Sequence, residues 1–243
     1  MPSLVAIDCT GQACSVALLH GGEVIERRSP PGERQSERLL VWLEQVLAEA
    51  GLAGSAIDGL AVGIGPGGFT GVRLALAAVQ GLALAWQRPV VPVSSLVALA
   101  AMSGATDADA AQANHGLPVL ATLDARMDEV YAAWFAPVHA GAWPQPLAPE
   151  AVLAPEALAI PEAVSQAGGY VAIGSGMPIY GERISQKLGP PRQVIAIDEP
   201  SAAAVVTLAA LVWPQAARSG HELQPAYLRN KVALTTAERQ AQR

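Results

Sequence analysis

The stretch GIGPGGFTG, residues 63–71, has the composition most suited to chemistry in this chain, because a glycine-rich turn that leads into a helix commonly binds phosphate. Its glycines satisfy the pattern G-x-G-x-x-G, but a dinucleotide site also needs an acidic residue after the next strand. That strand is PVVPVSS, residues 89–95, and no carboxylate follows it for many residues. A P-loop needs a lysine and a hydroxyl after the glycines, and no lysine is near. The sequence therefore disfavours a dinucleotide site and excludes a P-loop.

Other residue types capable of catalysis are present without the spacing that chemistry needs. The four histidines lie far apart and form no H-x-x-x-H or H-E-x-x-H pair: His20, His115, His139 and His221. No G-x-S-x-G elbow surrounds the candidate nucleophiles Ser15, Ser94 and Ser175. Cys9 and Cys14, five residues apart, fit neither a disulfide scaffold nor a C-x-x-C pair, and we predict two reduced thiols.

Two aspartates remain, each at the end of an apolar run. Asp8 ends LVAID and Asp124 ends VLATLD. A carboxylate at a strand end either caps the following turn or remains from a nucleotide–metal site, and the sequence leaves both readings open. If such a vestigial nucleotide site exists, we expect it to comprise Asp8, Thr10, Gly65, Gly67, Gly174 and Gly176.

The elements that must position these residues follow an α/β order. Short apolar runs at 4–8, 14–20 and 23–28 predict an antiparallel meander. A helix is predicted over 36–50, with Leu39, Leu43, Val46, Leu47 and Ala50 on one stripe, Ser36 as N-cap and Gly51 as its stop. A buried strand (57–64), a helix over 71–86 capped by Thr70, a strand (89–94) and a helix begun by Ser94 or Ser95 follow.

The second half repeats this pattern. The segment 119–135 again places a strand, an aspartate, a turn and a second strand in order, and YVAIGSG at 170–176 runs into another glycine turn. Two echoes in the same order predict a duplicated lobe. We divide the chain into an N-terminal lobe, 1–106, and a C-terminal lobe with a closing helix and tail, 107–243. Six prolines in 137–165 predict an irregular excursion, and Ser201 is expected to cap a helix over 202–213.

Composition narrows the class of protein. The 243 residues carry a net charge of −6 and only two lysines, which argues against an independent nucleic-acid binder. Basic residues gather towards the end, where either a solvated tail or a contact with RNA or a partner would explain them: Arg218, Arg229, Lys231, Arg239 and Arg243. No secretory signal is visible and the apolar runs are short or interrupted, so we expect a cytoplasmic protein without a membrane span.

Several segments resemble the TsaB (YeaZ) family. The similarity rests on AIDCTGQACSVAL, on the run from GIGPGGFTG to PVVPVSSL, on LDARMDEVYAAWF and on YLRNKVAL. The resemblance implies a two-lobed actin-like ATPase (actin–hexokinase–Hsp70) fold with duplicated ribonuclease H-like lobes. It also implies the subunit required, with the catalytic paralogue TsaD, for threonylcarbamoylation of N6 of adenosine 37 in tRNAs that read codons beginning with A.

The resemblance further implies a subunit without catalytic residues, metal or cofactor. TsaD carries two metal-binding histidines four residues apart, and the equivalent positions here are Ser95 and Leu99. A leucine cannot ligate a metal and a lone serine hydroxyl is a poor ligand. The implied partners are TsaD as a heterodimer, the ATPase TsaE, a second copy of the chain when alone, and tRNA only through the complex. A small ATP-binding kinase or ATPase of the same fold is the alternative.

The two predicted helices of the N-terminal lobe are the expected partner-binding surface. Small residues at helical spacing would let another helix approach closely: Gly71, Ala75, Ala78, Leu82 and Ala85. Helix 36–50 carries Trp42 among Arg38, Gln45 and Glu49, and we expect Trp42 to be an exposed interface anchor. The other reading is a helix pair buried only within its own lobe.

Overall fold

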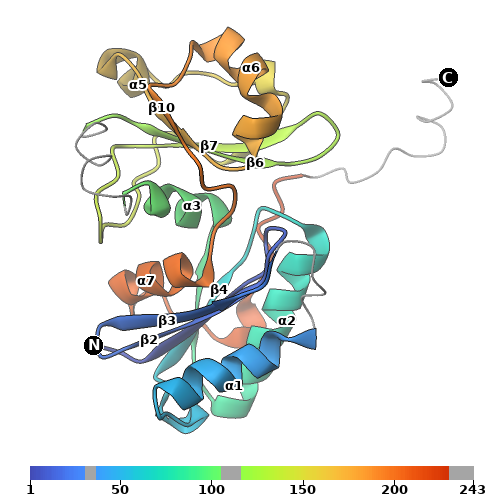
Figure 1. The fold of residues 1–243 in the computed structure, drawn as a ribbon, viewed down its shortest axis with the longest axis vertical. Helices are drawn as coiled ribbons and strands as arrows, with labels where there is room; N and C mark the ends of the chain where they lie inside the picture. The colour runs from blue at the N-terminus through green and yellow to red at the C-terminus, as the bar shows by residue number, and fades with distance from the viewer. Residues whose placement is uncertain (31–36, 105–115, 230–243) are drawn as a thin grey trace, which may run out of the picture.

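The computed structural model describes residues 1–30, 37–104 and 116–229. Two five-stranded sheets, each covered by helices, are stacked along the long axis of the molecule (Figure 1). The last described segment, 223–229, lies beside both halves.

The first sheet is built from the N-terminal meander and two parallel strands. Its elements are β1 (Leu4–Asp8), β2 (Ser15–His20), β3 (Glu23–Arg28), β4 (Gly59–Gly63) and β5 (Val90–Val93), in the order β3-β2-β1-β4-β5. The β1–β2 and β2–β3 pairs are antiparallel, whereas β1–β4 and β4–β5 are parallel. The predicted strands of the first half are confirmed.

The second sheet repeats this topology with other residues. Its strands are β6 (Val119–Asp124), β7 (Val130–Phe135), β8 (Ala151–Leu153), β9 (Val171–Ile173) and β10 (Gln193–Ile195), in the order β10-β9-β6-β7-β8. The β6–β7–β8 meander is antiparallel and β6–β9–β10 is parallel, as in the first sheet. The echo seen in the sequence is therefore a structural duplication, as the predicted fold class requires.

Alternate residues of each strand face different helical layers, because both faces of each sheet are covered. In β1, Val5 and Ile7 pack with α1 (Leu39–Glu49) and α2 (Phe69–Trp86), whereas Leu4 and Ala6 pack with α7 (Ala202–Val212). The second sheet packs against α3 (Ser95–Ser103) on one face and against α5 (Glu162–Ala167) and α6 (Gly176–Leu188) on the other. Helices α3 and α7 thus form the middle layers of the stack (Figure 1).

Helix α1 matches its predicted stripe but begins later than expected. Leu39, Leu43, Val46 and Leu47 are buried, and Gly51 with φ +65° follows the last turn. The N–H of Leu52 donates to Leu47 O and that of Gly51 to Ala48 O, which is the glycine-terminated helix end that the sequence indicated. The predicted N-cap Ser36 lies outside the described residues, and Arg38 takes the N-cap position without a side-chain hydrogen bond.

Helix α2 begins two residues before its predicted start. Gly68 is the N-cap, so the prediction of Thr70 as cap is wrong and Thr70 lies in the first turn. By length and composition alone, α2 is the one helix among the described residues that could cross a membrane, with a mean hydropathy of 1.4. Six of its residues are nevertheless buried in the first lobe, as in a core helix.

The remaining elements agree with the sequence in outline. Ser94 caps α3 by accepting the Leu96 N–H, and Ser201 caps α7 by accepting the Ala204 N–H. The excursion 137–165 is more regular than predicted, since it contains β8, a 3₁₀ turn (Pro155–Ala157) and the start of α5. Further 3₁₀ turns occupy Gly54–Ala56 and Gly220–Glu222. The predicted lobe boundary after residue 106 lies outside the described residues and stays a prediction.

Candidate functional site

A cleft of about 860 Å³ lies between the two lobes. The β1–β2 turn and the glycine-rich turn line it from the first lobe, and the β6–β7 turn with the start of α6 lines it from the second. The segment that leads from β10 to α7 and the C-terminal segment 225–229 complete the wall. The cleft is large enough for a small ligand.

The glycine-rich turn is packed against the β1–β2 turn. The N–H of Gly68 donates to Thr10 O over 2.8 Å, and a Cβ at Gly67 would lie 2.3 Å from the same oxygen. Gly65 has φ +92°, and a Cβ at Gly71 would lie 1.8 Å from Cys9 O. These glycines therefore allow two backbone segments to approach closely, which leaves no room for a phosphate between them.

Asp8 lies beneath this contact and is buried. Thr10 donates both its N–H, over 3.0 Å, and its hydroxyl to the Asp8 carboxylate. Burial raises the pKa of this carboxyl from its ordinary 3.8 to about 6, although the Thr10 hydrogen bonds lower it. The charge of Glu199 raises the pKa further and that of Arg28 lowers it. Asp8 thus caps the turn, which is one of the two roles that the sequence left open.

The second lobe presents an equivalent arrangement. Ser175, between Gly174 and Gly176, accepts the Asp124 N–H on its hydroxyl, and Tyr180 donates to the Asp124 carboxylate over 3.0 Å. A Cβ at Gly174 would lie 1.9 Å from Thr122 O, so the turn after β9 also packs closely on the neighbouring strand β6. The candidate residues thus fall into two clusters, one in each lobe, of which Thr10, Gly67, Asp124 and Ser175 reach the cleft.

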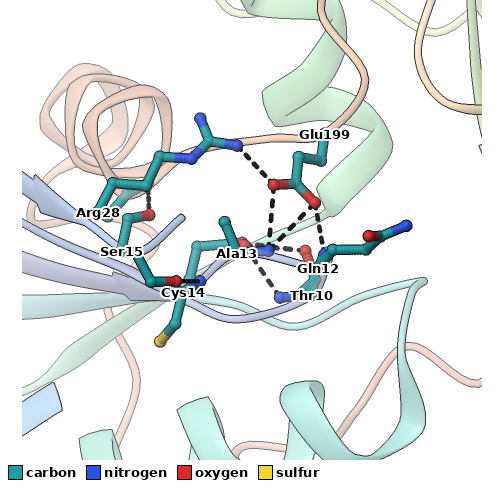
Figure 2. A network of polar contacts seen from close by, with 10 residues as sticks. Thr10, Gln12, Ala13, Cys14, Ser15, Arg28 and Glu199 are labelled. Atoms are coloured by element: carbon teal, nitrogen blue, oxygen red, sulfur yellow. Dashed lines mark hydrogen bonds and ion pairs between the residues drawn. The ribbon is translucent and has the colours of Figure 1, made fainter. Parts of the chain in front are cut away.

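Sequence reasoning missed the charged contact on the cleft wall. The carboxylate of Glu199 accepts the backbone N–H groups of Gln12 and Ala13, and the Arg28 guanidinium donates to it over 2.7 Å (Figure 2). The Glu199 side chain is only 13% exposed. No local pattern could have revealed this contact, because Glu199 lies 187 residues after Gln12 in the chain.

The prediction of two reduced thiols is wrong in this structure. Cys9 and Cys14 are joined as a disulfide, with their Cα atoms 4.2 Å apart. The β1–β2 register explains the pairing: Asp8 opposes Ser15, so residues 9 and 14 form the next cross-strand pair. Sequence spacing alone did not give this register.

The two positions that the sequence led us to consider as metal ligands are closed to solvent. Ser95 and Leu99 are both fully buried, and Leu99 belongs to the core that α3 forms with the second sheet. The Ser95 hydroxyl has no hydrogen-bond partner among the described residues. Within those residues no group of three or more histidine, cysteine, aspartate or glutamate side chains is placed to bind a metal ion.

The predicted partner-binding surface needs correction. Trp42 is only 6% exposed and packs inside the first lobe, so it is no exposed anchor, while Arg38 and Gln45 are exposed as expected. Gly71 and Ala75 are also buried, because α2 turns this side towards the sheet. Ala78 and Leu82 are half-buried at the boundary.

Other apolar residues of α1 and α2 face outward instead. On α1, Leu40 is 59% and Val41 48% exposed, and on α2 Leu84 is 83% exposed. Ala77, Gly81 and Ala85 share the exposed side of α2. We call these six residues the α1–α2 apolar surface. Helices α1 and α2 themselves cover the face of the first sheet opposite to α7 (Figure 1).

Comparison with known proteins assigns the family. The family model for TsaD, tRNA N6-adenosine threonylcarbamoyltransferase, matches residues 32–168. The tRNA threonylcarbamoyladenosine biosynthesis protein TsaB of Escherichia coli K12 is 33% identical over 235 residues, which span 95% of this chain and 96% of that protein. The chain belongs to the TsaB family.

Further similarities agree with this TsaB assignment. The TsaB protein of Haemophilus influenzae is 40% identical over 129 residues, which span 53% of this chain and 52% of that protein. The solved structure of YeaZ from Pseudomonas aeruginosa is 37% identical, covers 94% of this chain and all of its own, and superposes with a TM-score of 0.80. A second structure, described as similar to the peptidase YEAZ from the same organism, gives 0.83 at the same identity and coverage. The two-lobed architecture is therefore shared with these two structures over 94% of this chain.

Proposed function

We propose that this chain is the non-catalytic subunit that binds and activates TsaD in threonylcarbamoylation of N6 of adenosine 37 in tRNAs reading codons that begin with A. The observation that carries the proposal is the match, over nearly its whole length, to a protein named for tRNA threonylcarbamoyladenosine biosynthesis. The partners are TsaD, the ATPase TsaE, and a second copy of the chain when TsaD is absent. tRNA is reached only through the complex, in the cytoplasm and without a membrane.

The buried core between the lobes supports a role without catalysis. Ser95 and Leu99 occupy the positions that the resemblance aligns with a metal-binding histidine pair, and neither is exposed. A metal ion at this place would need ligating side chains and access from the cleft. Leu99 has no ligating atom, and its position is fully buried. The alternative of a small kinase or ATPase is not favoured, since the relatives are named TsaB and the Asp8 carboxylate is buried against Thr10.

The α1–α2 apolar surface supports the partner role. Leu84 on α2 and Leu40 on α1 are large apolar side chains left exposed, and exposed apolar side chains of this kind support a contact with a partner. The small residues Ala77 and Gly81 would let a partner helix approach α2 closely, and a Cβ built at Gly81 meets no atom within 4 Å. We infer that TsaD and a second copy compete for this surface, burying more than about 1,000 Å² in total.

Reconstitution of the tRNA modification tests the proposal. The chain is mixed with tRNA, threonine, bicarbonate, ATP and the adenylate-forming enzyme, with or without TsaD and TsaE, and threonylcarbamoyladenosine is measured by mass spectrometry. We expect product only when TsaD is present, and less product when this chain is left out. Product from this chain in the absence of TsaD would overturn the non-catalytic role.

A surface variant tests the partner site. Leu84→Glu places a charge in the proposed interface, where it would be desolvated, so we expect loss of co-elution with TsaD, loss of the homodimer and loss of product together. The control is Leu211→Glu on α7, where the leucine is 46% exposed on a different helix. Circular dichroism first shows that both variants are folded. A folded Leu84→Glu protein that still binds TsaD would place the interface elsewhere.

A further inference from the structure

The groups that converge on Glu199 are the groups that bind phosphate in other proteins. Two successive backbone N–H groups, those of Gln12 and Ala13, point at one carboxylate, and the Arg28 guanidinium contacts the same carboxylate over 2.7 Å (Figure 2). Paired backbone amides with a nearby arginine form a common recognition site for phosphate and carboxylate. Here the chain supplies both the donors and the anion.

The absence of a side chain at residue 11 lets the carboxylate reach these amides. A Cβ built at Gly11 would lie 2.0 Å from Glu199 Oε2 and 2.8 Å from Glu199 Cβ. Glu199 belongs to the segment that runs from β10 in the second sheet to α7 against the first. The contact therefore joins the crossover between the lobes to the β1–β2 turn.

The donor set faces the cleft, so an anion from solution would reach it if Glu199 moved away. Gln12, Arg28 and Glu199 all line the 860 Å³ cavity. Its other two arginines are also paired with carboxylates: Arg126 with Asp124 over 3.2 Å, and Arg229 with Glu129. Among the described residues that line the cleft, each guanidinium is thus neutralised by the chain itself.

We propose that the amides of Gln12 and Ala13, with Arg28, form a binding site for a phosphate-type anion, and that Glu199 is an internal ligand that keeps this site closed. Removing the Glu199 carboxylate leaves two amides and one guanidinium without their anion at the cleft wall. An external phosphate group then makes the same contacts. This inference is independent of the role with TsaD, because it concerns only contacts within this chain.

Nuclear magnetic resonance of the full ¹⁵N-labelled chain tests the proposal, with inorganic phosphate as the probe. In Glu199→Ala we expect a saturable shift of the Gln12 and Ala13 amide resonances, and in the unaltered protein no such shift over the same concentrations. The double variant Glu199→Ala/Arg28→Ala should lose the response. The matched control is Glu129→Ala, which frees Arg229 in the same cleft but leaves Glu199 on the two amides.

A second variant and two further ligands complete the experiment. Glu199→Gln retains the shape of the side chain and its carbonyl acceptor, so it replaces Glu199→Ala if the latter does not fold, and we expect a weaker response of the same amides. ADP and adenosine are compared next: a shift with ADP and none with adenosine assigns recognition to the phosphate. The proposal is overturned if a folded Glu199 variant leaves both amides unmoved, if the unaltered protein responds equally, or if adenosine alone gives the shift.

Discussion

At the scale of single residues, the carboxyl of Asp8 stands out in the described part of the first lobe by its raised pKa. This carboxyl is buried and its pKa is raised to about 6, so the folded protein binds a proton that the unfolded chain releases near pH 3.8. The Asp8 contribution is therefore most favourable below pH 3.8 and is lost as the pH rises to about 6 and above. A shift of this size corresponds to a loss on the order of 3 kcal/mol in the free energy of unfolding.

Asp8→Asn should remove this pH dependence. The amide oxygen of asparagine can still accept the Thr10 N–H, while no charge forms beneath the turn. We expect the free energy of unfolding of the variant, relative to the unaltered protein, to increase between about pH 4 and pH 6.5 and then to level off. Urea unfolding followed by circular dichroism at several pH values measures this difference. An equal difference at pH 4 and pH 7 would mean that Asp8 does not titrate in this window.

The residues also show how far sequence reasoning reaches. Asp8 and Thr10 can be named as candidates from the sequence because they stand where an apolar strand ends and a polar turn begins, a pattern that is visible locally. Glu199 was missed because its partners, Gln12 and Ala13, are far away in the chain and contribute only backbone atoms. The Cys9–Cys14 pairing depends on the β1–β2 register, which residue spacing does not determine.

At the scale of elements, the helices were predicted in the correct order but with one face in error. Trp42 lies three residues after Leu39 and four before Val46, so it shares their buried stripe although Arg38 and Gln45 on its other side are exposed. On α2 the exposed positions include Ala77 and Gly81, each one residue before the predicted Ala78 and Leu82, which are half-buried. The predicted Ala85 is exposed, beside Leu84. In a helix so rich in alanine and leucine, the sequence gives little contrast between its faces.

Two glycines of α2 provide a test of which side faces the protein. A Cβ at Gly71 would lie 1.8 Å from Cys9 O and 3.0 Å from its carbonyl carbon, atoms of a buried backbone that cannot move freely. A Cβ at Gly81 meets no atom within 4 Å. We expect Gly71→Ala to lower the free energy of unfolding by about 1–3 kcal/mol or more through steric overlap. Gly81→Ala should raise it by about 0.5–1 kcal/mol, because alanine favours the helix.

Urea unfolding of both variants at one protein concentration measures this pair, since self-association would otherwise change the apparent stability. Both variants replace glycine by alanine in the same helix, so the two measurements differ only in what surrounds residue 71 and residue 81. Effects of the same sign would show that α2 is rotated from the orientation described here.

At the scale of the whole molecule, the duplicated topology was predictable and the contacts between the lobes were not. The order strand, aspartate, turn, strand occurs once in each half of the sequence and so predicts one sheet in each lobe. The structure has these two sheets, with equivalent strand orders. Besides the packing of α3 on α7, the contacts between the lobes come from segments without periodicity, such as the crossover at Glu199 and residues 225–229. In the latter, Ala226 N–H donates to Ile64 O, and Arg73 donates to the Tyr227 hydroxyl over 2.9 Å, which fixes the segment to the first lobe.

Two residues later, Arg229 attaches the same segment to the second lobe. Its guanidinium pairs with Glu129 and approaches Arg126 O at 3.4 Å, both in the β6–β7 turn. The Arg229 side chain is 15% exposed, so this pair is better shielded than a surface ion pair, and its loss should cost about 1 kcal/mol or somewhat more. The segment therefore bridges the two lobes across the cleft.

Arg229→Ala should detach the bridge from the second lobe and leave its first-lobe end in place. We expect faster amide hydrogen exchange in the β6–β7 turn, where Glu129 N–H donates to Arg126 O and Ala125 N–H donates to Glu129 O, with little change at Ile64. The control is Arg192→Ala, whose guanidinium bonds Gly168 O within the second lobe and should leave the β6–β7 turn protected. Unchanged exchange in Arg229→Ala, or equal acceleration in both variants, would show that the bridge does not hold the lobes together, because a contact that links them must protect the turn to which it binds.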